Sequence, residues 1–210
     1  MLVFFLFINS HINTASFTLR HTLVYSSDWP QQTSQQRIGM KVREIVQTDR
    51  EAYRQLRATL DEESMMWGAE PGEREHLGAC ATTFGAGSQF DGALGNVKST
   101  IFVTEEEGVL VGFLSLETSS WKSLSYTTTL MVGALLAYQG KGIASQLFER
   151  SELWASKNGI HRIELLVFAA NCSAIRLYKK LGYNQEGIRQ QSSLINGKFV
   201  DEVYMAKLLL

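Results

Sequence analysis

Hydrophobic residues follow two different periods along the chain from residue 40 onward. A spacing of three to four residues, which places side chains on one helix face, joins Tyr53, Leu56 and Leu60 in a segment that begins near residue 48. The whole pattern predicts one α/β domain over residues 40–210. Alternating or continuous apolar runs, the pattern of strands, lie at 41–46, 99–104, 110–117 and 125–135.

Two more helices and three more strands are predicted in the last third of the chain. Between Gly142 and about Asn158, a spacing of three to four residues places Ile143, Leu147, Phe148 and Trp154 on one helix face. A shorter helix begins at Asn171, a residue type that caps helix N-termini well, and ends before Gly182, which suits a C-terminal stop. The strand patterns of this region lie at 161–168, 186–189 and 197–206.

Three segments of the first half have the composition of loops. Residues 61–74 mix Met, Trp, Gly and Pro, and we expect a semi-ordered loop there. The glycine-rich segment 85–95 is expected to be a second loop. Glu105-Glu106-Glu107-Gly108 is expected to form the turn between two strands.

The segment Gln139-Gly140-Lys141-Gly142-Ile143-Ala144 lies between a strand pattern and a helix pattern. The first turn of a helix has unpaired N–H groups and a partial positive charge. Two glycines allow phosphate oxygens to approach these donors without a Cβ in the way. Strand, glycine turn and helix together therefore predict a site for a ligand that carries phosphate.

The turn does not match the P-loop pattern and matches the dinucleotide-binding pattern only in part. A P-loop needs Gly-x-x-x-x-Gly-Lys-Ser/Thr, but Leu135 stands five residues before Gly140 and Lys141 is followed by another glycine. In a dinucleotide fingerprint Ser145 would replace the third glycine. Its acidic partner, Glu164, would open the second strand instead of closing it. A tight turn without any ligand is the simplest interpretation of the glycines alone.

A second motif lies downstream and favours a different ligand. Residues 171–183 have the order Asn-x-x-Ala-x-x-Leu-Tyr-x-x-x-Gly-Tyr. With the glycine turn, this motif resembles the GNAT acetyltransferases of bacterial type, and the resemblance runs from about residue 41 to residue 210. It implies the α/β (α+β) GNAT fold, a mixed and mostly antiparallel central sheet with helices on both faces. It also implies an N-acetyltransferase that moves an acetyl group from acetyl-CoA to a primary amine.

The resemblance assigns acetyl-CoA, as co-substrate, to two parts of the chain, with no metal. Tyr178 occupies the family position of the group that protonates the leaving thiolate, although a core aromatic would also suit this helix. The pantetheine arm would contact the strand at Val132, Gly133 and Ala134, and also Asn171. The residues expected at the pyrophosphate are Gln139, Gly140, Lys141, Gly142, Ile143, Ala144 and Ser145.

The general base is harder to assign. Ribosomal-protein acetyltransferases carry a glutamate five residues before the motif asparagine, and that position is Leu166 here. Glu164 and Glu117 are the candidates instead, although a salt-bridged or solvated carboxylate is the simpler explanation of each. The absent glutamate also leaves open a catalytically silent acyl-CoA-binding or regulatory module on the same fold. The expected acceptor-binding residues are Glu63, Trp67 and Glu70.

Composition limits the remaining choices. The chain has 210 residues, 45% of them hydrophobic, and a net charge of −1, which gives no electrostatic footprint for nucleic acid. Cys80 and Cys172 form neither a disulfide framework nor a metal-binding spacing, so we expect a cytoplasmic protein. No apolar run is long enough to span a bilayer, so we expect no membrane partner. The expected partner is a small-molecule amine or a peptide N-terminus, and a homodimer stays open. Residues 1–39 are interpreted as an extension outside the fold, with Met40 as the natural start.

Overall fold

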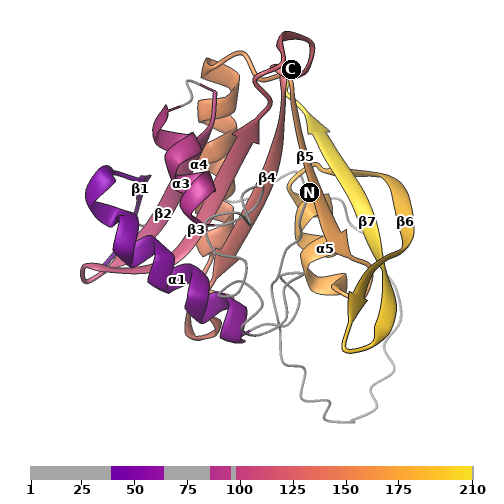
Figure 1. Ribbon diagram of the computed structural model, residues 1–210, viewed down its shortest axis with the longest axis horizontal. Coiled ribbons are helices and arrows are strands. Elements are labelled where there is room, and N and C mark those ends of the chain that lie inside the picture. The colour runs from indigo at the N-terminus through magenta and orange to yellow at the C-terminus, as the bar shows by residue number, and fades with distance from the viewer. Residues whose placement is uncertain (1–38, 64–85, 96–97, 210) are drawn as a thin grey trace, which may run out of the picture.

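The computed structural model describes residues 39–63, 86–95 and 98–209. These residues form a single seven-stranded sheet with the strand order β1-β2-β3-β4-β5-β7-β6 (Figure 1). The helices are α1 (Arg50–Glu63), α3 (Ala86–Gly95), α4 (Ile143–Lys157) and α5 (Cys172–Lys180). The strands are β1 (Met40–Glu44), β2 (Thr100–Glu106), β3 (Val109–Thr118), β4 (Thr127–Ala134), β5 (Arg162–Phe168), β6 (Asn184–Ile195) and β7 (Lys198–Leu208).

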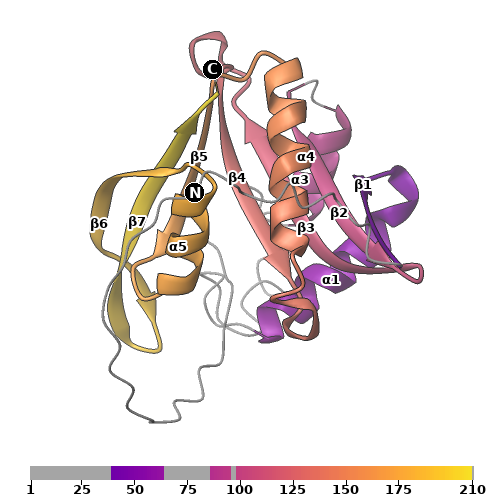
Figure 2. The same cartoon turned by 180° about the vertical axis from the view of Figure 1, so that it is seen from behind.

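Neighbouring strands run antiparallel except in the middle of the sheet. There β4 and β5 are parallel, and α4 provides the crossover that a parallel pair requires. Helices α1 and α3 lie on one face of the sheet, against β2 and β3, and α4 lies on the other face (Figures 1 and 2). Helix α5 packs on the α4 side, where Phe148 and Tyr178 are in contact. This arrangement confirms the predicted fold class.

The predicted helix faces are the buried ones. Tyr53, Leu56 and Leu60 of α1 are all at most 3% exposed and pack in the main core. Helix α4 likewise buries Leu147 and Phe148. The periods seen in the sequence therefore gave the correct inward face for both helices.

The glycine-rich segment 85–95 was expected to be a loop, and that prediction is wrong, because α3 occupies residues 86–95. Phe90 anchors the helix: its ring is 1% exposed, lies 6.2 Å from the Tyr53 ring and is covered by the guanidinium of Arg50 at 4.7 Å. Burial of one aromatic side chain contributes about 2 kcal/mol. This exceeds the penalty of about 1 kcal/mol for Gly92 in the helix interior, while Gly87 and Gly95 lie in the first and last turns. Tertiary packing has overridden local propensity here.

The acidic turn also differs in extent from its prediction. β2 continues through Glu106, so that the turn is confined to Glu107 and Gly108, both with positive φ. Glu105 belongs to the strand because it pairs with Lys41 of β1 and accepts a hydrogen bond from Arg43 Nε at 2.8 Å. The neighbouring strand thus holds a carboxylate that the sequence alone assigned to a turn.

The two halves of the sheet part between β4 and β5. These strands pair over only three residues of each, Thr127–Thr129 with Arg162–Glu164. Beyond that point β4 pairs only with β3, as far as Ala134, and β5 pairs only with β7, as far as Phe168, among the described strands. Figure 1 shows the strands diverging from their shared end. One edge of the second half of β4 therefore has no strand partner among the described residues.

Candidate active site

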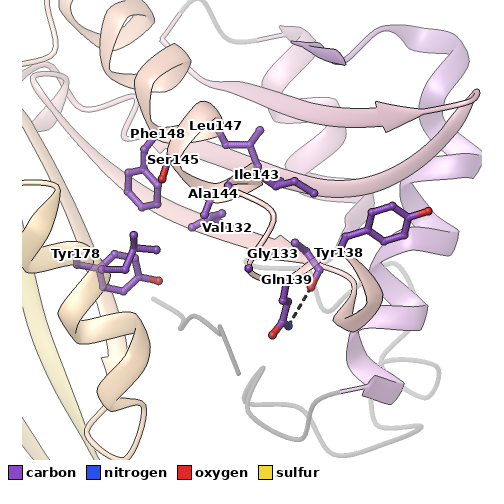
Figure 3. Close-up of a pocket in the computed structure, with 14 residues that line it drawn as sticks. Val132, Gly133, Tyr138, Gln139, Ile143, Ala144, Ser145, Leu147, Phe148 and Tyr178 are labelled. Carbon is purple, nitrogen blue, oxygen red and sulfur yellow. Dashed lines mark hydrogen bonds between the residues drawn. The ribbon is translucent and has the colours of Figure 1, made fainter. Parts of the chain in front are cut away.

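A pocket of about 180 Å³ lies beside β4, where that strand has left β5 (Figure 3). Its walls come from the second half of β4, the loop and first turns of α4, and one face of α5. The residues that line it are Val132, Gly133, Ala134, Tyr138, Gln139, Gly140, Gly142, Ile143, Ala144, Ser145, Leu147, Phe148, Leu177 and Tyr178.

Nine of the eleven residues predicted to bind the co-substrate are in this set. Tyr138, Leu147, Phe148 and Leu177 were missed as pocket residues. Leu147 and Phe148 were assigned to the buried helix face, and their period could not reveal that this face also borders a pocket. Tyr138 could have been found by its position next to the glycine loop.

Both glycines of the loop adopt the left-handed conformation, which favours a residue without a Cβ. Gly140 has φ of 71° and Gly142, the residue before the first turn of α4, has φ of 82°. A Cβ on Gly142 would meet no atom of the described residues within 4 Å, so the backbone is open on that side. The first N–H groups of α4 follow directly, and such groups bind anions through hydrogen bonds and the helix dipole.

The edge of β4 forms a second wall. Gly133 pairs with Phe113 and Ala134 with Gly112 on the β3 side. Their other side faces the gap left by β5, as described above. Backbone N–H and C=O groups at such an edge can pair with an extended ligand that contains amides, as they would with another strand.

Tyr178 stands across the pocket from this edge (Figure 3). Its side chain is fully buried, with its ring 5.7 Å from that of Phe148 and 6.2 Å from that of Tyr183. Burial, and to a lesser degree the neighbouring Tyr183, raises the pKa of the Tyr178 hydroxyl well above its usual 10. The hydroxyl thus keeps its proton at neutral pH and can serve as a proton donor.

Two predicted co-substrate residues do not line the pocket. Lys141 turns its ammonium over the Tyr138 ring, 4.4 Å from the centroid, an attraction that fixes the side chain on the loop. Asn171 caps α5 as predicted: its Oδ1 accepts hydrogen bonds from Ala174 N at 3.1 Å and Ser173 Oγ at 3.0 Å. Contact of either residue with a bound molecule stays a prediction.

The two candidate base residues lie on one face of the sheet, on either side of Thr129. Glu117 pairs with Thr129 from β3, and Glu164 pairs with it from β5. Paired residues in a sheet point to the same face. Glu164 accepts hydrogen bonds from the Tyr204 hydroxyl and from Arg162 Nε, the latter at 3.1 Å. Neither carboxylate lines the pocket.

Tyr204 lies beside Leu166, which occupies the position of the glutamate in ribosomal-protein acetyltransferases. It pairs directly with Leu166, which is fully buried in a small cluster with Phe168. Burial, and then its bond to Glu164, raises the pKa of the Tyr204 hydroxyl. No local pattern indicates Tyr204, because it lies 40 residues from Glu164 and meets it only through strand pairing.

The predicted acceptor-binding residues can be placed only in part. Glu63 ends α1, and its Oε2 accepts a hydrogen bond from Leu136 N at 2.8 Å. Trp67 and Glu70 lie outside the described residues, as do residues 1–38 of the predicted extension 1–39. Over the described ranges, no group of three or more histidine, cysteine, aspartate or glutamate side chains could hold a metal ion. In the same ranges, no helix has the length and apolar character needed to cross a membrane.

A glycine loop at a helix N-terminus lies beside an edge of β4 that has no strand partner among the described residues, and a buried tyrosine lines the same pocket. These features suit a ligand with phosphate and amide groups. Comparison with known proteins shows which family the chain belongs to. The model of the acetyltransferase (GNAT) family matches residues 43–183, and the chain belongs to this family.

Relatives of known name match about half of the chain. Over 102 residues, this chain is 33% identical to the L-amino acid N-acetyltransferase AaaT of Escherichia coli (strain K12). The match covers 48% of this chain and 63% of that protein. Over 108 residues, this chain is 30% identical to the L-methionine sulfoximine/L-methionine sulfone acetyltransferase of Salmonella typhimurium. The match covers 50% of this chain and 62% of that protein. The chain thus spans less than two thirds of either relative.

Solved structures share the fold at lower identity. The structure of yncA from Salmonella typhimurium, described with its cofactor acetyl-CoA, superposes with a TM-score of 0.67 and 22% sequence identity. The match covers 82% of this chain and 95% of the other. This likeness extends the fold assignment beyond the residues that the family model matches.

Proposed function

We propose that the protein is an N-acetyltransferase that transfers the acetyl group of acetyl-CoA to a primary amine. The observation that carries the proposal is the pocket between the glycine loop and Tyr178, beside the edge of β4 that β5 has left. Two named relatives act on L-amino acids or their analogues, which favours a small α-amino acid over a protein N-terminus as the acceptor.

The residues present suit both ends of acetyl-CoA. The N–H groups that follow Gly142 and the open side of that glycine suit the pyrophosphate. The edge at Val132–Ala134 suits the amides of the pantetheine arm, and an N–H of this edge would stabilise negative charge on the reacting carbonyl oxygen. When bound, acetyl-CoA supplies the thioester that the amine attacks.

Two proton movements remain for the side chains. The Tyr178 hydroxyl donates a proton to the departing sulfur, a role for which its raised pKa and its place in the pocket are suitable. Glu164 or Glu117 removes the proton of the acceptor amine through water, because neither carboxylate lines the pocket. The Tyr204 hydroxyl and Arg162 Nε both donate to the same oxygen of Glu164, Oε2, and so orient its carboxylate.

A pair of glycine variants tests the binding site. Gly142 and Gly159 both have positive φ, 82° and 70°, and a Cβ at either would meet no atom of the described residues within 4 Å. Alanine in this conformation costs about 1–2 kcal/mol at either position. Gly159 lies beyond the C-terminal end of α4, away from the pocket. It therefore controls for backbone strain.

We expect calorimetry to show acetyl-CoA binding for the wild type and Gly159→Ala, and at least tenfold weaker binding for Gly142→Ala. A Cβ at residue 142 would stand where phosphate oxygens must approach the backbone. Thiol release from acetyl-CoA, followed with a panel of L-amino acids, polyamines and a peptide, then identifies the acceptor. Equal affinity in the two variants would contradict the loop assignment, and absence of thiol release with every amine would contradict the activity.

A further inference from the structure

The side chain of Glu63 ties the connection between β4 and α4 to helix α1. Its Oε2 accepts the N–H of Leu136, a residue 73 positions along the chain. Leu136 opens η5 (Leu136–Tyr138), the short 3-10 helix between β4 and the glycine loop. The first N–H groups of a helical turn find no partner within the turn, so an acceptor from another element is needed to satisfy them. The carboxylate of Glu63 satisfies the first one.

The η5 turn in turn places the residues of the pocket. Tyr138 N donates to Leu135 O at 2.8 Å, and Gln139 N donates to Leu136 O at 3.2 Å. The Gln139 side chain closes back on β4 through Nε2, which donates to Ala134 O at 3.3 Å (Figure 3). Tyr138 and Gln139 both line the pocket, and Gly140 follows at once. A shift of Leu136 therefore moves the start of the glycine loop.

We propose that Glu63 is a positioning residue for the co-substrate loop, acting through its hydrogen bond to Leu136 N. The inference rests on the proposed binding of acetyl-CoA at this loop. It gives the carboxylate a different task from acceptor binding, which the sequence suggested. A negative charge near a pyrophosphate site would repel the ligand, so the hydrogen bond carries the effect and the charge does not.

Three variants separate these roles. Glu63→Ala removes the acceptor atom, Glu63→Gln keeps an oxygen that can accept the Leu136 N–H, and Glu62→Ala changes the exposed neighbouring carboxylate on the same helix. We expect acetyl-CoA binding, measured by calorimetry, to weaken about fivefold in Glu63→Ala, the size of one exposed hydrogen bond. Glu63→Gln and Glu62→Ala should bind within a factor of two of the wild type. Thermal unfolding of each variant checks that the fold is intact.

Steady-state kinetics on the best amine adds a second criterion. The Glu63→Ala variant should show a raised KM for acetyl-CoA and an unchanged KM for the amine. Unchanged acetyl-CoA affinity in Glu63→Ala would overturn the inference while the proposed function stands, and so would equal losses in Glu63→Ala and Glu63→Gln. A raised KM for the amine alone would return Glu63 to acceptor binding. A wild-type protein that does not bind acetyl-CoA would overturn the proposed function and the inference together.

Discussion

The role of Tyr178 can be tested by a change of one atom. Tyr178→Phe removes the hydroxyl and keeps the ring, whose contacts with Phe148 and Tyr183 fill the space between α4, α5 and the strand that follows. The side chain is fully buried, so the phenylalanine occupies the same volume without exposing new surface. We therefore expect acetyl-CoA affinity to stay within about twofold of the wild type.

The expected loss is in kcat. General acid catalysis contributes on the order of 10²-fold at the low end, which corresponds to about 2.7 kcal/mol of activation free energy. The matched control is Tyr183→Phe in the same aromatic cluster. Tyr183 is 1% exposed, does not line the pocket, and its hydroxyl is buried with no hydrogen-bond partner within the described residues. Loss of that hydroxyl should leave kcat unchanged.

The assay is thiol release at saturating acetyl-CoA, with calorimetry for affinity. A pH profile adds an independent test, because a proton donor must be protonated to act. The raised pKa of Tyr178 keeps the donor form present from neutral pH up to and beyond 10. Full turnover in Tyr178→Phe would refute the assignment, as would equal losses in the two phenylalanine variants. A fall of kcat centred well below pH 10 that disappears in Tyr178→Phe would refute the predicted pKa.

Three further outcomes are expected. Glu164→Gln and Tyr204→Phe should each lower kcat/KM for the amine about tenfold without changing acetyl-CoA affinity. The two effects should not add in the double variant, because the two groups share one hydrogen bond. Unchanged kcat/KM in Glu164→Gln would assign the general base to Glu117 instead. Asp49→Asn should lose about 1 kcal/mol in urea unfolding at pH 7, because the Arg43 hydrogen bond, and then the Val46 N–H, lower the pKa of this carboxyl below 3.8. That contribution is present above pH 3.8 and is lost as the pH falls through the folded-state pKa, so wild type and variant should converge in acid, and a constant difference would contradict the reasoning. Removal of residues 1–39 should leave the melting temperature within about 4 °C of the full chain, since all seven described strands begin at or after residue 40; a larger fall would make that segment part of the fold.

Local signals accounted for most of the elements and for the co-substrate loop. Helix caps, strand periods and glycine positions are encoded by residues that are close in sequence, so Asn171, Gly142 and the buried face of α1 could be predicted without a structure. The same local logic failed at α3. Its glycines indicate a loop, but the segment is helical where Phe90 is buried against Tyr53 of α1 and the helix packs on β2 and β3.

The position of the candidate active site depends on tertiary structure. No period in the sequence shows that β4 and β5 pair over three residues and then part, since strand pairing depends on packing between distant segments. That separation brings the edge at Val132–Ala134 to face Tyr178. It was also the fold that brought Glu63 to Leu136 and Tyr204 to Glu164. Local patterns therefore indicated most residues of the co-substrate pocket, and long-range contacts established which of them meet.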